Sequence, residues 1–240
     1  MNETAWWQVA FGDHYQSLYA HRDDLSAADE IAGLIPRLSQ VHGPVLDMGC
    51  GNGRHLTALR QAGINAYGCD YSSDLLRRAI QRPTCAGKMM RGDMRQPPVT
   101  TGWGAVLMLF TAFGYFSHQQ NAECLGSLGQ LLVPGGWLVL DLPDPDVLAR
   151  TLVPLSQRLL PDGRQVEETR RLHAGRVEKK VVMRQGDKVT QRYRESVALY
   201  DRSAMATLAA ANGLLVSEVW TSLLGPEHDA QRLVFWLQRA

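Results

Sequence analysis

The chain of 240 residues has few cysteines, almost no net charge and no long apolar run. Its four cysteines include no CxxC pair, so a disulfide framework or a zinc knuckle has little support. The most apolar segment, 104–116, is 13 residues long, well short of the roughly 20 that a membrane-spanning helix needs. The N-terminus also lacks the basic and apolar regions of a secretory signal. We therefore expect a soluble cytoplasmic protein with reduced thiols and no membrane partner.

The net charge of +1 provides no global field that would draw the protein to nucleic acid. Because nucleic-acid binding rests largely on Lys and Arg contacts to phosphate, such binding would need a local basic patch. Between Ser156 and Arg194 the chain does hold eleven Lys and Arg residues against five Asp and Glu. This segment is either a solvated sheet face or a binding surface for an anionic acceptor or nucleic acid.

Short apolar runs alternate with helix-like segments between about residues 43 and 142. The predicted strands are Val45–Met48, Asn65–Cys69, Lys88–Arg91, Ala105–Phe110 and Trp137–Asp141. The predicted helices between them are Arg54–Ala62, Ser73–Ile80 and Gln119–Leu132. A further helix, Ser203–Ala211, and strands Leu214–Trp220 and Leu233–Gln238 end the chain. This alternation predicts βαβ units and a mostly parallel sheet.

The pattern changes after residue 153 to strand-like runs of mixed polarity, Gln165–Leu172, Arg176–Arg184 and Lys188–Leu199. Turn signals at Ala174-Gly175 and at Gln185-Gly186-Asp187 separate these runs, as in an antiparallel meander. We therefore expect an N-terminal segment over 1–42, an α/β domain over 43–152 and 201–240, and an antiparallel insertion over 153–200.

A glycine-rich turn, Asp47-Met48-Gly49-Cys50-Gly51-Asn52-Gly53, joins the first predicted strand to the first helix. Glycines at alternate positions let the backbone approach a ligand where any Cβ would collide. A dinucleotide-binding loop instead has the spacing G-x-G-x-x-G, and its last glycine position is Arg54 here. The carboxylate of Asp47 suits a cationic ligand better than a pyrophosphate. The alternative is a tight turn that binds nothing.

Acidic residues also end the second and third predicted strands. Asp70 can accept hydrogen bonds from ribose hydroxyls, although it can equally form a turn or cap a helix. Asp93, within Gly92-Asp93-Met94, can bind the exocyclic amine of adenine. Carboxylates at three successive strand ends line one crevice at the carboxyl edge of an open sheet, where such folds bind ligands.

Together these motifs resemble those of class I S-adenosylmethionine-dependent methyltransferases. Residues 47–53 resemble the first motif of that family, Asp70 its ribose-binding acid and residues 92–94 its adenine motif, and Pro134-Gly135-Gly136 resembles the turn before its fifth strand. The resemblance covers residues 43–142 and 201–240 and is specific for cofactor and fold rather than for substrate. It implies an α/β, Rossmann-like, doubly wound, mostly parallel seven-stranded sheet, with the antiparallel insertion after the fifth strand, and S-adenosyl-L-methionine as cofactor.

Two further segments are similar to a small-molecule branch that includes sugar N-methyltransferases of antibiotic pathways. They are residues 110–116, FTAFGYF, and residues 11–15, FGDHY, followed by Tyr19 and Arg22. In that branch the N-terminal segment folds over the cofactor and an antiparallel sheet covers the active site. The resemblance places Tyr15, Tyr19 and Arg22 near the sulfonium or methionine carboxylate, Gly49, Cys50 and Gly51 at the methionine part, Asp70 and Tyr71 at the ribose and adenine, Asp93 and Met94 at the adenine edge, and Phe110 and Thr111 beside the methyl group.

The chemistry of a sulfonium needs alignment and exclusion of water, since its methyl group is already activated. Aromatic faces and oxygen lone pairs suit the positive sulfur, and the candidates for such a cage are Tyr15, Tyr19, Phe110, Tyr115 and Tyr200. A general base is needed only when the acceptor is protonated, and His118 is the candidate, unless it merely starts a helix. No HExxH or cysteine–histidine pattern implies a metal.

We expect a methyltransferase acting on a nitrogen or oxygen of a small molecule; no oligomeric state follows from the sequence. The alternatives are a tRNA or other nucleic-acid methyltransferase that uses the basic insertion, and a protein that binds the cofactor without methyl transfer. A nicotinamide-dependent oxidoreductase is disfavoured by Arg54. Finally, Phe11, Tyr15 and Tyr19 recur every four residues and can share one face of a helix. They predict that segment 11–22 is a lid over the cofactor, or else fixed packing on the core.

Overall fold

The computed structural model describes residues 5–12, 15–19, 23–229 and 231–239, and within these ranges seven strands form a central sheet. The strand order is β10-β11-β5-β4-β1-β2-β3. The bounds are β1 Val45–Met48, β2 Ala66–Asp70, β3 Met89–Arg91, β4 Trp103–Met108, β5 Leu132–Pro143, β10 Leu214–Trp220 and β11 Arg232–Arg239. Strand β11 runs antiparallel to β5 and β10, whereas the other neighbouring strands pair in parallel. The predicted mostly parallel α/β sheet is confirmed.

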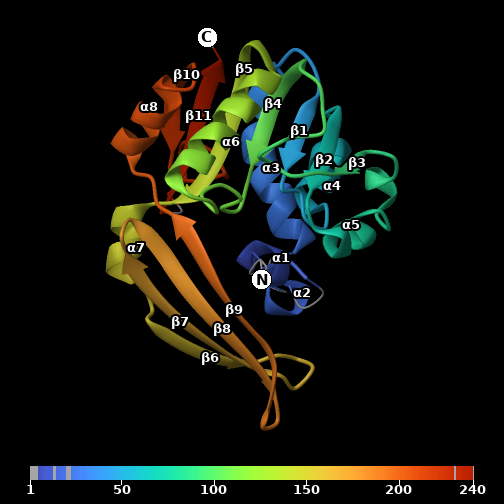
Figure 1. Cartoon of the computed structure of the whole chain (residues 1–240). Helices are drawn as coiled ribbons and strands as arrows, with labels where there is room; N and C mark the ends of the chain where they lie inside the picture. Colours follow the sequence, from blue (N-terminus) through green and yellow to red (C-terminus); the bar gives the residue numbers. More distant parts are fainter. Residues whose placement is uncertain (1–4, 13–14, 20–22, 230, 240) are drawn as a thin grey trace.

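Helices cover both faces of this sheet, as Figure 1 shows. They are α3 Asp24–Leu38, α4 Arg54–Gln61, α5 Ser73–Ala79, α6 His118–Leu131 and α8 Arg202–Ala210, with a short 3₁₀ turn, η1, over Pro83–Cys85. Apolar side chains of α3 and α4, such as Leu34 and Leu56, pack on one face. Those of α6 and α8, such as Leu128 and Met205, pack on the other. Because both faces are covered, every residue of β4 is buried.

Side-chain caps fix where several of these helices begin. Asp23, Ser72, Ser117 and Asp201 each accept a hydrogen bond from a backbone N–H in the first turn of α3, α5, α6 and α8. Such caps contribute about 1 kcal/mol each because the first N–H groups of a helix have no partner within it. For α8 the N–H of Ala204 donates to Oδ1 of Asp201 at 2.7 Å.

Strand β5 differs from the prediction. The segment Pro134-Gly135-Gly136 was expected to stop the preceding helix and precede a strand, but the strand begins at Leu132 and contains it. Strand β4 pairs with β5 at Trp103–Leu132 and again at Ala105–Trp137, so the segment is an irregularity between two paired stretches. Gly135 makes this bend possible with a φ of 75°.

A second, antiparallel sheet of four strands is formed by described residues between 155 and 198, in the order β6-β7-β8-β9. Its strands are β6 Leu155–Leu159, β7 Gln165–His173, β8 Arg176–Gln185 and β9 Lys188–Ala198, and helix α7, Pro145–Thr151, leads into it. The three predicted strands are confirmed, whereas β6 and α7 were not predicted. In Figure 1 this sheet extends away from the central sheet, and α1 and α2 lie beside it.

The N-terminal segment forms two short helices, α1 Trp6–Ala10 and α2 Tyr15–Leu18. Ala10 and Leu18 are buried against Val181 and Tyr193 of the second sheet. The prediction that Phe11 shares a helix face with Tyr15 and Tyr19 is wrong, because Phe11 ends α1 in a turn. The rings nevertheless form a row, with centroid distances of 5.3 Å from Phe11 to Tyr15 and 4.7 Å from Tyr15 to Tyr19. Over the described ranges, no helix combines the length and apolar character needed to cross a membrane.

Candidate functional site

Two of the cavities formed by the described residues adjoin at the carboxyl ends of β1, β2 and β4. Their volumes are about 210 and 310 Å³, and both are lined by Tyr15, Gly49, Gly51, Leu109 and Phe110. The first cavity also brings together the predicted residues Asp70, Tyr71, Asp93 and Met94. The second adds Tyr19, Asp47 and Cys50. Most of the residues predicted from separate strand ends therefore line one continuous crevice.

The glycine-rich turn has a backbone that few other residues adopt. The φ angles of Gly49, Gly51 and Gly53 are 81°, 54° and 78°, in the left-handed region that favours glycine. The N–H groups of Gly49 and Cys50 donate to the carbonyl oxygen of Cys69, at 2.7 and 3.1 Å. A loop that binds a pyrophosphate directs such groups to its ligand. Here they bind the neighbouring strand and are not directed to a ligand.

Asp47 is a buried carboxylate at the second cavity. It is 2% exposed, and its Oδ2 atom accepts no hydrogen bond from any described residue. The pKa of Asp47 is raised to about 6, chiefly by burial; the nearby His55 and Arg54 act to lower it, and Asp70 acts to raise it. A buried carboxylate without a full set of partners is unfavourable. A cationic ligand in this cavity would relieve that cost.

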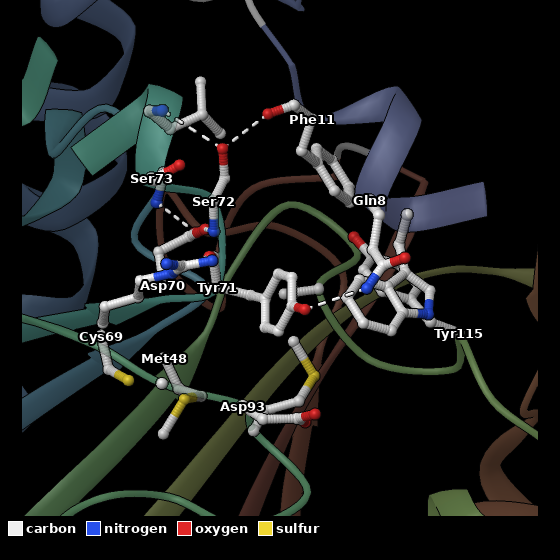
Figure 2. A pocket seen from close by; sticks show the side chains of 18 of the residues that line it. Gln8, Phe11, Met48, Cys69, Asp70, Tyr71, Ser72, Ser73, Asp93 and Tyr115 are labelled. Atoms are coloured by element: carbon white, nitrogen blue, oxygen red, sulfur yellow. Dashed lines mark hydrogen bonds between the residues drawn. The ribbon is translucent and has the colours of Figure 1, made fainter. Parts of the chain in front are cut away.

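Asp70 lies at the end of β2 and lines the first cavity (Figure 2). Its Oδ1 accepts from the N–H of Ser72 at 2.7 Å and its Oδ2 from that of Gly51 at 2.8 Å. Burial raises the pKa of Asp70, and the hydrogen bonds from Ser72 and Gly51 act in the opposite direction. These bonds fix the carboxylate at the edge of the cavity, where it has lone pairs for further donors.

Asp93 is held by a partner that the sequence did not reveal. The guanidinium of Arg95 donates to both of its carboxylate oxygens over 2.6–3.1 Å. Burial alone would raise the pKa of Asp93, but the hydrogen bonds from Arg95 outweigh it and lower the pKa. The guanidinium carbon of Arg95 in turn lies 4.7 Å from the centroid of the Phe116 ring. Asp93 therefore lines the first cavity while it is ion-paired with Arg95.

The N-terminal helix α1 forms a wall of the first cavity through residues that sequence reasoning did not assign. Gln8 donates from Nε2 to the hydroxyl of Tyr71 at 2.9 Å, and the Trp7 ring meets the Tyr71 ring edge-on at 4.6 Å. The hydroxyl of Ser72 donates to the carbonyl oxygen of Phe11 at 2.6 Å (Figure 2). The paired tryptophans at the start of the chain were the only sequence signal for this wall.

The second cavity has two further residues that the sequence analysis did not assign to a ligand. Arg54 and His55 follow the glycine-rich turn in the first turn of α4 and flank the ring of Phe110. The guanidinium carbon of Arg54 lies 5.2 Å from the Phe110 centroid, and the His55 ring 5.6 Å from it. The Nε2 atom of His55 lies 2.7 Å from Oε2 of Glu30, and this hydrogen bond fixes the orientation of the His55 ring. The sequence signal available for Arg54 and His55 was their position directly after Gly53, at the end of the glycine-rich turn.

Several predicted residues lie elsewhere. Thr111 lines neither cavity. Its hydroxyl instead accepts a hydrogen bond from Arg232 at 2.9 Å. His118 is exposed at the first residue of α6, outside both linings. Tyr200 is buried, and its hydroxyl accepts from Asn121 at 3.0 Å, so its place in the aromatic cage is wrong. The prediction for Arg22 falls outside the described residues.

Much of the basic insertion is neutralised within the second sheet. Arg170 pairs with Glu168 at 2.5 Å and Arg171 with Glu178 at 2.6 Å. Lys179 lies between Glu195, at 2.8 Å, and the hydroxyl of Tyr19, at 2.5 Å. These pairs fit the interpretation of a solvated and internally paired sheet better than that of a nucleic-acid surface.

Comparison with known sequences identifies the central part of the chain. Residues 45–136 match the family model described as a methyltransferase domain. The dTDP-3-amino-3,6-dideoxy-alpha-D-glucopyranose N,N-dimethyltransferase of Streptomyces fradiae is 29% identical over 115 residues, which are 48% of this chain and 45% of that protein. A second relative, an uncharacterized methyltransferase of Geobacillus kaustophilus, is matched over 56% of its length. The chain thus spans about half the length of the curated relatives that it matches.

Solved structures match over nearly the whole chain. The CcbJ methyltransferase of Streptomyces caelestis superposes with a TM-score of 0.79 at 18% identity, over 97% of this chain and 99% of that one. The sugar N-methyltransferase KedS8 of a Streptoalloteichus species superposes with a TM-score of 0.73 at 20% identity, over 100% and 98%. These likenesses confirm the predicted fold, and the family match confirms the resemblance over residues 45–136.

Proposed function

We propose that this chain, which carries a methyltransferase domain over residues 45–136 and has the fold of S-adenosylmethionine-dependent methyltransferases, transfers the methyl group of S-adenosylmethionine to a nitrogen or oxygen of a small molecule. The observation that carries the proposal is the continuous crevice. One end presents the fixed carboxylate of Asp70, and the other the buried, incompletely bonded carboxylate of Asp47. These two groups match the ribose and the ammonium, which lie on opposite sides of the sulfonium of that cofactor.

The residues present fit the cofactor. Asp70 accepts from the ribose hydroxyls, Tyr71 and Met94 flank the adenine, and Asp93 with its partner Arg95 lies at the adenine edge. The Oδ2 atom of Asp47, which is without a hydrogen bond from the described residues, takes the ammonium of the methionine part. Gly49, Cys50 and Gly51 bring the backbone close to the same part.

The protein's catalytic task is alignment and exclusion of water. The bound cofactor would supply an activated methyl group, so a neutral amine acceptor can attack it directly, without a covalent enzyme intermediate. Tyr15, Tyr19 and Phe110 line the second cavity, and aromatic rings suit a positive sulfur. Tyr15 also lines the first cavity and is the residue we assign to orienting the acceptor. The exposed position of His118 gives no support to a general base there.

A small-molecule acceptor is supported by the covering of the site. Trp7 and Gln8 of α1 line the first cavity, and Tyr15 of α2 lines both. The same two helices pack on the second sheet through Ala10 and Leu18. We assign the covering of the acceptor to residues 153–200. The relative from Streptomyces fradiae acts, by its name, on an amino sugar. The four buried free thiols fit a reducing compartment such as the cytoplasm.

Calorimetry of the purified chain tests the cofactor. S-adenosylmethionine and S-adenosylhomocysteine are expected to bind, whereas NAD is not. Asp70→Ala should weaken binding about ten- to hundredfold, because hydrogen bonds to a charged group contribute about 1.5–3 kcal/mol. Asp201→Ala is the matched control, since it removes an acidic N-cap distant from the crevice. NAD binding without binding of S-adenosylhomocysteine would overturn the proposal.

A transfer assay with methyl-labelled S-adenosylmethionine then tests the acceptor. Amino sugars and small amines are compared with tRNA at low and high salt. Label in a small amine supports the proposal. Salt-sensitive label in tRNA instead would transfer the assignment to the nucleic-acid alternative.

A further inference from the structure

The backbone directly after β4 is held in a conformation that its residues do not favour. Phe110 and Thr111 have φ angles of 55° and 61°. Consecutive non-glycine residues in the left-handed region are uncommon, and a β-branched residue such as Thr111 adopts it least readily. Interactions elsewhere must therefore hold this bend in place.

An ion pair between the buried Asp141 of β5 and the half-buried Arg232 of β11 holds this bend. Asp141 of β5 accepts from both strained residues: its Oδ2 from the N–H of Phe110 at 2.8 Å, and its carbonyl oxygen from the N–H of Thr111 at 2.9 Å. Arg232, the first residue of β11, binds the Asp141 carboxylate. It also donates to the carbonyl oxygen of Asp141 at 3.1 Å and to the hydroxyl of Thr111 at 2.9 Å.

The bend has a consequence at the crevice. Phe110 lines both cavities, and its ring lies beside His55 and Arg54 at the end that contains Asp47. Asp141 and Arg232 line neither cavity. Their influence on a ligand must therefore pass through Phe110.

We propose that Asp141 and Arg232 are positioning residues. By holding Phe110 and Thr111 in the left-handed conformation, they place the Phe110 ring at the junction of the two cavities and shape the methionine side of the cofactor site. The adenosine side is built mainly by Asp70, Tyr71 and Asp93, so it depends less on the two positioning residues. The inference rests on the proposed cofactor, and its test is chosen to separate the two.

The test compares two ligands. Adenosine occupies the Asp70 side alone, whereas S-adenosylhomocysteine occupies both sides. Arg232→Met should weaken S-adenosylhomocysteine about tenfold, on the scale of one released left-handed residue, and weaken adenosine much less. Arg239→Met is the matched control: it removes an arginine that binds the carbonyl of Leu132 from the other end of the same strand, and should affect neither ligand. If Arg232→Met does not fold, Arg232→Lys is measured in the same way, since lysine keeps the charge but not the fork of donors.

A rescue variant separates positioning from a general structural role. Glycine adopts the left-handed conformation without cost, so Arg232→Met with Thr111→Gly should recover most of the affinity for S-adenosylhomocysteine. Equal weakening of both ligands, no weakening, or no recovery by the double variant would each overturn the inference. A wild-type chain that binds neither ligand would instead overturn the proposed cofactor.

Discussion

The affinity for S-adenosylhomocysteine should depend on pH through Asp47. The pKa of its buried carboxyl is raised to about 6 in the free protein, and the ammonium of the ligand needs the ionised form. Below this pKa the ionised fraction falls about tenfold for each pH unit. Binding at pH 5 should therefore be about tenfold weaker than at pH 7.5, since about one molecule in ten is then competent.

Calorimetry in two buffers that differ in ionisation enthalpy measures this. At pH 5 binding should release close to one proton, because the ammonium lowers the pKa of Asp47, and at pH 7.5 it should release almost none. Asp47→Asn should bind weakly and with little dependence on pH. Adenosine, which lacks the ammonium, serves as the control for the other carboxylates, including Asp70. An affinity for S-adenosylhomocysteine that stays flat between pH 5 and 7.5 would refute the assignment of Asp47 to the ammonium.

Three further outcomes are expected. First, the carboxylate of Asp47 should lower the stability of the free protein at neutral pH. Its pKa of about 6 exceeds the reference of 3.8 by about two units, so the folded state binds the proton more tightly than the unfolded state does. The free energy of unfolding should therefore fall by up to about 3 kcal/mol as pH rises from 4 to 7. Denaturation in urea should accordingly show Asp47→Asn to be more stable than wild type at pH 7, and to lose that advantage at pH 4. Leu18→Ala should lower the free energy of unfolding by about 2–5 kcal/mol, because Leu18 is 2% exposed within the cluster on the second sheet; a loss below 1 kcal/mol would show that α2 is not anchored there. Hydrogen exchange should show extra protection over 6–12 and 15–19 when S-adenosylhomocysteine is bound, since Gln8 and Phe11 contact Tyr71 and Ser72; strong and equal protection in both states would mean that the segment is fixed structure.

The cofactor end of the crevice could be predicted because its signals are local. The turn from Asp47 to Gly53 lies between one strand and one helix, and Asp70 directly ends the next strand. Alternation of apolar runs was enough to order these elements into a parallel sheet, which brings their carboxyl ends together. No distant residue was needed to recognise either motif.

The remainder depends on partners far apart in the sequence. The bend at Phe110 and Thr111 needs Arg232, which is 121 positions from Thr111, and no local pattern shows that the hydroxyl of Thr111 is used there. Strand β6 was missed because Leu155 and Leu159 are exposed on an edge strand, so no alternation with buried residues marks it. The role of Trp7 and Gln8 likewise follows only from the packing of α1 beside Tyr71.

The packing of α1 and α2 on the second sheet has a consequence for exchanging parts between such proteins. The second sheet is one continuous insertion of the chain between β5 and α8. Its continuity suggests that a different acceptor-covering segment could replace it as a single unit. Yet Ala10 and Leu18 share a hydrophobic cluster with Val181 and Tyr193. A chimera in which only this insertion is exchanged would pack the side chains of another protein against the native α1 and α2. The transferable unit is therefore discontinuous, and a working graft must carry α1 and α2 together with the sheet.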